Sequence, residues 1–163
     1  MMKFSVTAFL TAGSLAAGAV FLPSLADNRG SRQFVAPPET VRKECSSCHM
    51  VFPPQMLPAR SWTAVVDGLP SHFGENLSLD DQKRKEITDW LTANAGDGPG
   101  VTKEYLRGVM LSQTPLRITE TYAWIQEHRR EARDGDFAKP NVKSKANCVA
   151  CHKDAEMGIF DGE

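Results

Sequence analysis

The sequence has few of the residues that usually bind metals, with only four cysteines and four histidines among 163 residues. Its charges nearly cancel, since 19 basic residues face 20 acidic ones and the formal net charge is −1. A chain without a basic field, a base-reading motif or a phosphate-cradling loop is not expected to bind nucleic acid. Beyond the N-terminus, no stretch is apolar enough to cross a bilayer. The length allows one ordinary domain or two very small ones.

The N-terminus has the pattern of a cleaved signal peptide. A short start with Lys3 precedes residues 4–22, which are apolar or small and carry no charge. Ser24-Leu25-Ala26 then offers a small-x-small cleavage site ahead of the polar Asp27. We expect residues 1–26 to be removed on export, which leaves a periplasmic protein with no stable membrane span. The alternative is a retained anchor, because the apolar run is almost long enough to span a bilayer.

All four cysteines lie in two Cys-x-x-Cys-His motifs, and none is left over. In c-type haem attachment, two thiols bond to the vinyl groups of one haem and the next residue, His, binds the iron. The spacing suits this chemistry because the three side chains fall within little more than one helical turn. We therefore predict two covalently bound haem c groups, at Cys45-Ser46-Ser47-Cys48-His49 and at Cys148-Val149-Ala150-Cys151-His152.

Three other interpretations of the cysteines compete with haem. Structural disulfides are plausible in an exported protein, although a bridge within Cys-x-x-Cys is more typical of a redox-active site. Two Cys-x-x-Cys pairs would also supply the four thiolates of a zinc site. A thioredoxin-like site requires a βαβ context, which the sequence does not show. Haem is favoured because it uses every residue of each motif.

The two histidines outside the motifs are candidate distal ligands. His49 and His152 are expected to be the proximal ligands, and the sixth position of such an iron is open or is filled by Met or His. His72 lies 23 residues after His49, and His128 lies 24 residues before His152. We predict that His72 binds the iron of haem 1 and that His128 binds the iron of haem 2.

Alternatives to this ligand set remain. Met56, Met110 and Met157 are rival distal ligands, although core filling is the commoner role of Met. One alternative is that either histidine is an ordinary surface or core residue. Another is that a distal histidine binds the haem of the other half of the chain. His/His ligation predicts a lower reduction potential than His/Met ligation.

Helix caps and breakers predict a mainly α-helical chain without strands. The glycine-rich stretch 94–100 is its clearest break, and it divides an N-terminal haem module (27–98) from a C-terminal haem module (99–163). Caps are expected at Ser61, Ser78 and either Thr119 or Thr121. The helices are expected near 39–44, 62–69, 79–93, 102–111 and from the last cap to about 133, with a short helix carrying the second motif.

The residues around both motifs resemble the bacterial dihaem cytochrome c family. The resemblance implies a first module like a class I cytochrome c, a less regular second module, and His/His ligation of both haems by His72 and His128. In the first half it is carried by Glu44–His49, Phe52-Pro53-Pro54, Leu57-Pro58, Ser61-Trp62 and His72-Phe73-Gly74. In the second half it is carried by Pro115–Thr119, Trp124, His128 and Asn147–Lys153.

This resemblance implies an electron-transfer protein rather than an enzyme, and no catalytic residues are predicted. The implied partners are redox proteins: a monohaem oxygen-binding cytochrome c as acceptor, as in some relatives, and a membrane cytochrome b as donor.

The rival function is a dihaem peroxidase or another oxygen-reactive haem enzyme, which requires an open iron site, and the two spare histidines argue against it. A ligand sensor or a subunit docked in a larger respiratory complex is a further alternative. Arg117 is a candidate to pair with a haem propionate, although an ordinary surface or structural role suits it equally.

Overall fold

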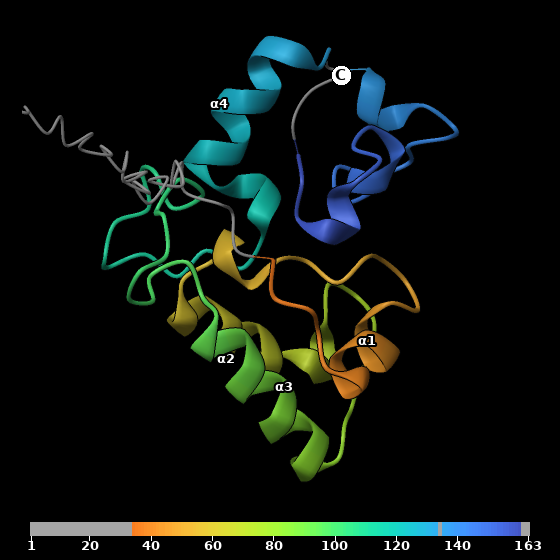
Figure 1. The fold of residues 1–163 in the computed structure, drawn as a ribbon. Coiled ribbons are helices and arrows are strands. Elements are labelled where there is room, and N and C mark those ends of the chain that lie inside the picture. The colour runs from red at the N-terminus through yellow and green to blue at the C-terminus, as the bar shows by residue number, and fades with distance from the viewer. Residues whose placement is uncertain (1–33, 134, 161–163) are drawn as a thin grey trace, which may run out of the picture.

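The computed structural model describes residues 34–133 and 135–160 (Figure 1). The predicted signal peptide lies outside these residues. Over the described ranges the chain is mainly helical, as expected, and contains no strand. None of the helices there is both long and apolar enough to cross a membrane. The α-helices are α1 (Glu39–Cys45), α2 (Ala59–Asp67), α3 (Asp81–Ala93) and α4 (Tyr122–Glu131), and short 3₁₀ turns lie between and after them.

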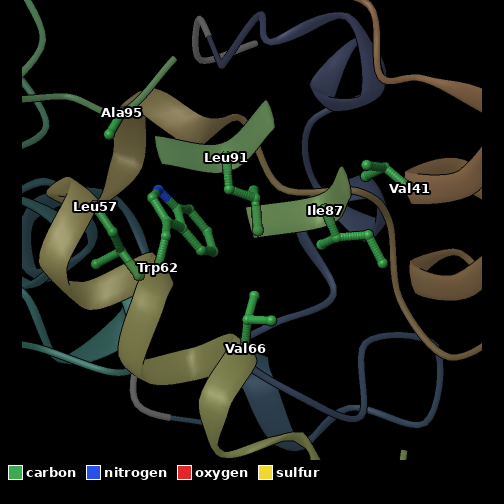
Figure 2. Close-up of a cluster of buried hydrophobic side chains, with 7 residues drawn as sticks. All are labelled: Val41, Leu57, Trp62, Val66, Ile87, Leu91 and Ala95. Carbon is green, nitrogen blue, oxygen red and sulfur yellow. The ribbon is translucent and has the colours of Figure 1, made fainter. Parts of the chain in front are cut away.

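Helices α1, α2 and α3 enclose the main hydrophobic core (Figure 2). The indole Nε1 of Trp62 donates a hydrogen bond of 2.7 Å to the carbonyl oxygen of Pro54, which ties the proline-rich loop after the first motif to α2. Ile118, from the second half of the chain, also packs against this core. The buried members of the core are Val41, Leu57, Trp62, Val66, Ile87, Leu91 and Ala95.

Helix α2 begins earlier than predicted, and Ser61 is not its cap. The helix starts at Ala59, after Pro58, and Ser61 is fully buried in its first turn. The exposed amide of Ala59 instead donates to Oδ1 of Asp97 at 2.8 Å. A side chain 38 residues away therefore satisfies one of the free amides at the start of the helix. This contact is tertiary, so the local sequence could not reveal it.

The cap of α3 is Asp80 rather than Ser78. The carboxylate Oδ1 of Asp80 accepts the amide of Lys83 at 2.9 Å, as an N-cap does. Ser78 donates its hydroxyl to Oδ1 of Asn76 at 2.7 Å, which holds it in the preceding turn. The helix therefore begins two residues later than expected.

The second half contains less helix than the sequence predicts. Thr121 caps α4, accepting the amide of Trp124, so this prediction is confirmed. Residues 102–111 form turns rather than a helix. Gly108 adopts a left-handed φ of 78° against the side chain of Tyr122, which an α-helix does not allow. The second motif lies on a 3₁₀ turn, Cys148–Ala150, and not on an α-helix.

Contacts cross the predicted boundary between residues 98 and 99. The guanidinium of Arg60 on α2 donates to the carbonyl oxygens of Gln113 at 2.7 Å and of Met110 at 2.9 Å. The division into two modules stays a prediction, while these bonds hold the loop after the glycine-rich stretch against α2.

Replacing Gly96 with Ala should destabilise the protein by about 1–3 kcal/mol. An added Cβ would lie 2.2 Å from the carbonyl oxygen of Gln55 and 3.0 Å from Cγ of Leu106. Backbone must therefore move at the point where the two halves meet. Gly135→Ala is the control, because a Cβ there meets no atom within 4 Å. Denaturant unfolding of the haem-loaded proteins measures the difference, and equal stability of both variants would contradict the close packing.

Candidate functional site: two pairs of facing histidines

The first Cys-x-x-Cys-His motif begins at the end of α1. Cys45 is the last residue of the helix and packs against the core, whereas Cys48 is exposed. The ring Nδ1 of His49 lies 2.6 Å from the carbonyl oxygen of Met50. A carbonyl oxygen only accepts hydrogen bonds, so Nδ1 carries the proton and Nε2 keeps the free lone pair that a metal requires.

His72 faces His49 across the first site. The 3₁₀ turn Leu69–Ser71 ends immediately before His72. The centroids of the two imidazole rings are 6.3 Å apart and their planes meet at 31°. Two imidazoles on opposite sides of one metal ion, with metal–nitrogen bonds of about 2 Å, have centroids about 6 Å apart. The spacing of this pair therefore fits a single iron between the rings.

Burial lowers the pKa of His72 from its ordinary value, and the nearby His49 and Arg117 lower it further. Each of these effects disfavours the charged imidazolium. A neutral ring is the form that binds a metal. Arg117 itself lies over the ring of Phe73, with its Cζ 3.9 Å from the ring centroid, and its Nε is 3.4 Å from a carboxylate oxygen of Glu120.

The second motif is held by its own turn. The amide of His152 donates to the carbonyl oxygen of Cys148 at 2.9 Å, which closes the motif within one turn. Just before it, the side-chain amide of Asn147 donates to the carbonyl oxygen of Val142 at 2.9 Å, and Val142 is buried. Two local hydrogen bonds thus replace the predicted helix in presenting Cys148, Cys151 and His152.

His128 faces His152 from α4. The centroids of these two rings are 6.1 Å apart, and their planes are nearly perpendicular at 86°. The Nδ1 of His128 lies 2.9 Å from the carbonyl oxygen of Trp124 one turn earlier, so Nε2 is again the nitrogen left free. Figure 1 shows the C-terminal segment that carries His152 lying opposite α4. The second pair therefore also has the spacing of two ligands on one metal.

Aromatic side chains line both sites. In the first, Phe52 stacks on His49 with centroids 4.6 Å apart. In the second, Trp124 stacks on His128 with centroids 3.9 Å apart and planes at 17°. Phe137 and Phe160 complete the second wall, at 6.0 Å from the ring of His128 and 5.6 Å from that of His152. Sequence reasoning missed both of these phenylalanines, and no motif marks either one.

Thr121, Trp124, Ile125 and His128 have the i, i+3, i+4 and i+7 spacing of one helix face, but this face of α4 is only partly inward. Thr121 is buried and Trp124 shares the side of His128, but Ile125 is exposed. The i, i+4 spacing of Trp124 and His128 was the useful signal, because it places the indole and the backbone carbonyl of one residue against the imidazole of the other.

The rival interpretations of the cysteines find no support in the geometry. Burial raises the pKa of the Cys45 and Cys148 thiols above the ordinary value. A redox-active Cys-x-x-Cys site requires a lowered thiol pKa instead. All four cysteines are free thiols in this structure. Within the described ranges, which include both motifs, no three His, Cys, Asp or Glu side chains gather in a metal-binding group, so the thiols do not form a four-cysteine zinc site.

The methionines proposed as rival ligands lie in other settings. Met56 is buried in the 3₁₀ turn that precedes α2. Met110 and Met157 are 61% and 50% exposed. The histidines, by contrast, already face the motif histidines at ligand spacing. The free thiols, the facing imidazoles and the aromatic walls together fit two haem groups, one at each motif.

Comparison with known proteins agrees with this chemistry. The sequence profile of the dihaem cytochrome c family matches residues 41–160. The chain belongs to the dihaem cytochrome c family. Two covalently attached c-type haems and a part in electron transport come with that membership.

Solved structures of dihaem cytochromes c resemble the chain over most of its length. The diheme cytochrome c from Rhodobacter sphaeroides is 43% identical, with 78% of this chain and 100% of that chain covered and a TM-score of 0.72. A crystal structure of DHC purified from the same organism is 42% identical over 77% of this chain and 99% of the other, with a TM-score of 0.65. The diheme cytochrome from Shewanella baltica OS155 is 34% identical over 78% and 89%, with a TM-score of 0.62. No curated protein matches the sequence.

Replacing both Cys148 and Cys151 with Ser should leave a protein with one covalent haem. The thioether bonds of the second motif would be lost, while the first motif lies on separate elements at the end of α1. Pyridine haemochrome absorbance per protein, together with the mass of the denatured protein, measures the haem count. The reciprocal Cys45→Ser and Cys48→Ser pair is the control. Two covalent haems in either double variant would contradict the assignment of the motifs.

Proposed function

We propose that this dihaem cytochrome c relays single electrons between redox proteins in the periplasm, through two haems that are each closed by a pair of histidines. The observation that carries the proposal is the presence of two facing imidazole pairs, 6.3 Å and 6.1 Å apart, each with one member in a haem motif. We assign His49 and His72 to the iron of haem 1, and His152 and His128 to the iron of haem 2. Cys45, Cys48, Cys148 and Cys151 form the thioether bonds.

The haem supplies an iron that accepts and gives up one electron. The paired histidines would hold that iron in one geometry in both oxidation states. Because the four imidazoles lie on separate elements, they would leave no vacant position for a substrate and would move little when the charge of the iron changed. Rigid ligation of this kind suits electron transfer, in which the protein supplies orientation and electrostatics rather than reacting groups.

Hydrogen bonds to the ligands favour low reduction potentials. The carbonyl oxygens of Met50 and Trp124 accept from Nδ1 of His49 and His128. Such a bond raises the basicity of the opposite nitrogen, which favours the ferric iron. His/His ligation itself gives a lower potential than His/Met ligation. Both effects suit a carrier that passes electrons onward.

The rival function, a dihaem peroxidase or another oxygen-reactive enzyme, requires an open or displaceable iron ligand. His72 and His128 lie where such an enzyme would leave room for its substrate. His128 is further held by a helix, by a hydrogen bond and by stacking on Trp124. These contacts favour closed sites and therefore a carrier.

The location and the partners of the protein are part of the same proposal. The N-terminal signal pattern supports export to the periplasm. A monohaem oxygen-binding cytochrome c is the proposed acceptor and a membrane cytochrome b the proposed donor. Both partners rest on the family resemblance alone, since fold does not specify them.

Carbon monoxide tests the closed-site proposal directly. The reduced wild-type protein should keep its low-spin spectrum under carbon monoxide, because each iron would already be bound by two histidine nitrogens. A potentiometric titration in the same cell should show two one-electron steps at low potential. A large Soret change in the wild-type protein would reveal an open site and would favour the enzymatic alternative.

His128→Ala should open the second haem alone. Carbon monoxide should then bind one haem per protein, because the opposite side of its iron has lost its ligand. His72→Ala is the matched variant and should open the first haem alone. If either variant keeps a fully low-spin His/His spectrum, or if one substitution opens the other haem, the ligand assignment is wrong.

The different ring angles should make the two haems distinguishable by electron paramagnetic resonance. The planes of the first pair meet at 31° and those of the second at 86°. Nearly parallel imidazoles split the iron d orbitals widely and give a rhombic low-spin signal, whereas nearly perpendicular ones give a signal with one very large g value. The oxidised protein should show one signal of each kind. Two identical rhombic signals would contradict the angle of the second pair.

A further inference from the structure

The turn that carries His72 is short and conformationally strained. The amide of His72 donates to the carbonyl oxygen of Glu75 at 2.7 Å, and the amide of Glu75 donates back at 3.0 Å. Between them, Phe73 has a φ of 51° and Gly74 a φ of 108°. A bulky residue in the left-handed region is strained and persists only where its surroundings hold it there. The Phe73 ring lies against that of His72, with centroids 4.7 Å apart, and a contact from outside the turn would hold it in that position.

Arg117, from the other half of the chain, makes that contact. Its guanidinium carbon lies 3.9 Å from the centroid of the Phe73 ring, well within the range of a cation–π interaction. The next residue, Ile118, packs against the core enclosed by α1, α2 and α3. The backbone of Arg117 is thus anchored in the first half, while its side chain covers the ring beside His72.

The charge of Arg117 also reaches the first site. Its guanidinium carbon lies 3.9 Å from the centroid of the Phe73 ring, which in turn lies 4.7 Å from the centroid of the His72 ring. The guanidinium keeps its charge at any ordinary pH. Glu120 lies 3.4 Å away and partly offsets the charge, and solvent screens it further because the Arg117 side chain is 47% exposed. The remaining field acts on the iron position beside His72.

We propose that Arg117 is a positioning residue for haem 1, which fixes the turn of His72 through Phe73 and raises the reduction potential of that haem. This inference rests on the proposed ligation of haem 1 by His72. Ferric haem carries one more positive charge than ferrous haem, so a nearby cation favours the reduced form. The two halves of the chain are then coupled electrically, because a residue of the second half tunes the haem of the first.

The distal ligand of the second haem is held by other contacts. His128 lies on α4 and is held by the carbonyl oxygen and the ring of Trp124, both on its own helix. Arg117 contacts Phe73 and Glu120. A change at Arg117 should therefore act on haem 1 and leave haem 2 as it is.

The test is a titration of the haem-loaded full chain monitored by electron paramagnetic resonance, which follows the two haems separately. Arg117→Gln should lower the ratio of reduced to oxidised haem 1 about tenfold at a fixed solution potential, a fall of about 59 mV for one electron. The g values of haem 1 should shift as its turn relaxes. Arg117→Lys keeps the charge but not the planar stacking, so it should retain most of the potential while its g values shift.

Arg84→Gln is the matched control. Arg84 also pairs with an acidic residue three positions away, Asp81, and its side chain is 49% exposed. Its removal changes the net charge equally without touching Phe73, so haem 1 should keep its potential. A second variant, Phe73→Leu, should shift the g values of haem 1 as Arg117→Gln does. The double variant should shift these g values no further than either single variant, because both substitutions remove the same contact between Arg117 and Phe73.

The outcomes separate this inference from the proposed function. If Arg117→Gln leaves both potentials and both spectra unchanged, or shifts the two haems equally, the inference is wrong although the His/His ligation stands. An effect of Arg84→Gln as large as that of Arg117→Gln would also overturn it, since the effect would then be one of net charge. If haem 1 of the wild-type protein binds carbon monoxide, the proposed ligation itself has failed.

Discussion

The rest of the structure depends on one geometric requirement, that two imidazoles face each other about 6 Å apart on either side of one metal. Each half of the chain meets it by a different route. In the first, the end of α1 and the turn after Ser71 bring His49 and His72 together. In the second, a 3₁₀ turn and α4 do the same for His152 and His128. The remaining elements hold these four histidines in place.

The two halves differ in how they obtain rigidity. The first has an apolar core of its own, in which α2 and α3 pack against each other and α1 packs on α3. The second has few regular elements, and aromatic rings take the place of a helical core: Trp124 and Phe137 on one side, Phe160 and Tyr105 on the other. A haem between these walls would supply apolar surface that the short chain lacks. This difference agrees with the expected contrast between a regular and a less regular module.

The sequence predicted the chemistry of the sites better than the shape of the second half. The two motifs predicted the haems because a Cys-x-x-Cys-His motif is local in the sequence, whereas the distal roles of His72 and His128 stay predictions. The cap at Thr121 was also readable. The start of α2 was not, since its partner Asp97 is remote in the sequence. The helix expected over 102–111 fails for a similar reason, because Gly108 adopts its conformation against Tyr122 on α4.

The strained turn at His72 also bears on the entropy of assembling the two sites. His49 and His72 are 23 residues apart and His128 and His152 are 24 apart, so bringing each pair together closes loops of nearly equal length. Loop-closure entropy grows only with the logarithm of loop length, so this cost is almost the same for both. One non-glycine residue also adopts a positive φ in or beside each loop, Phe73 at 51° just after the first and Lys143 at 66° within the second. The backbone cost of closing the two sites is therefore similar, although a strained turn carries the distal histidine of one site and helix α4 carries that of the other.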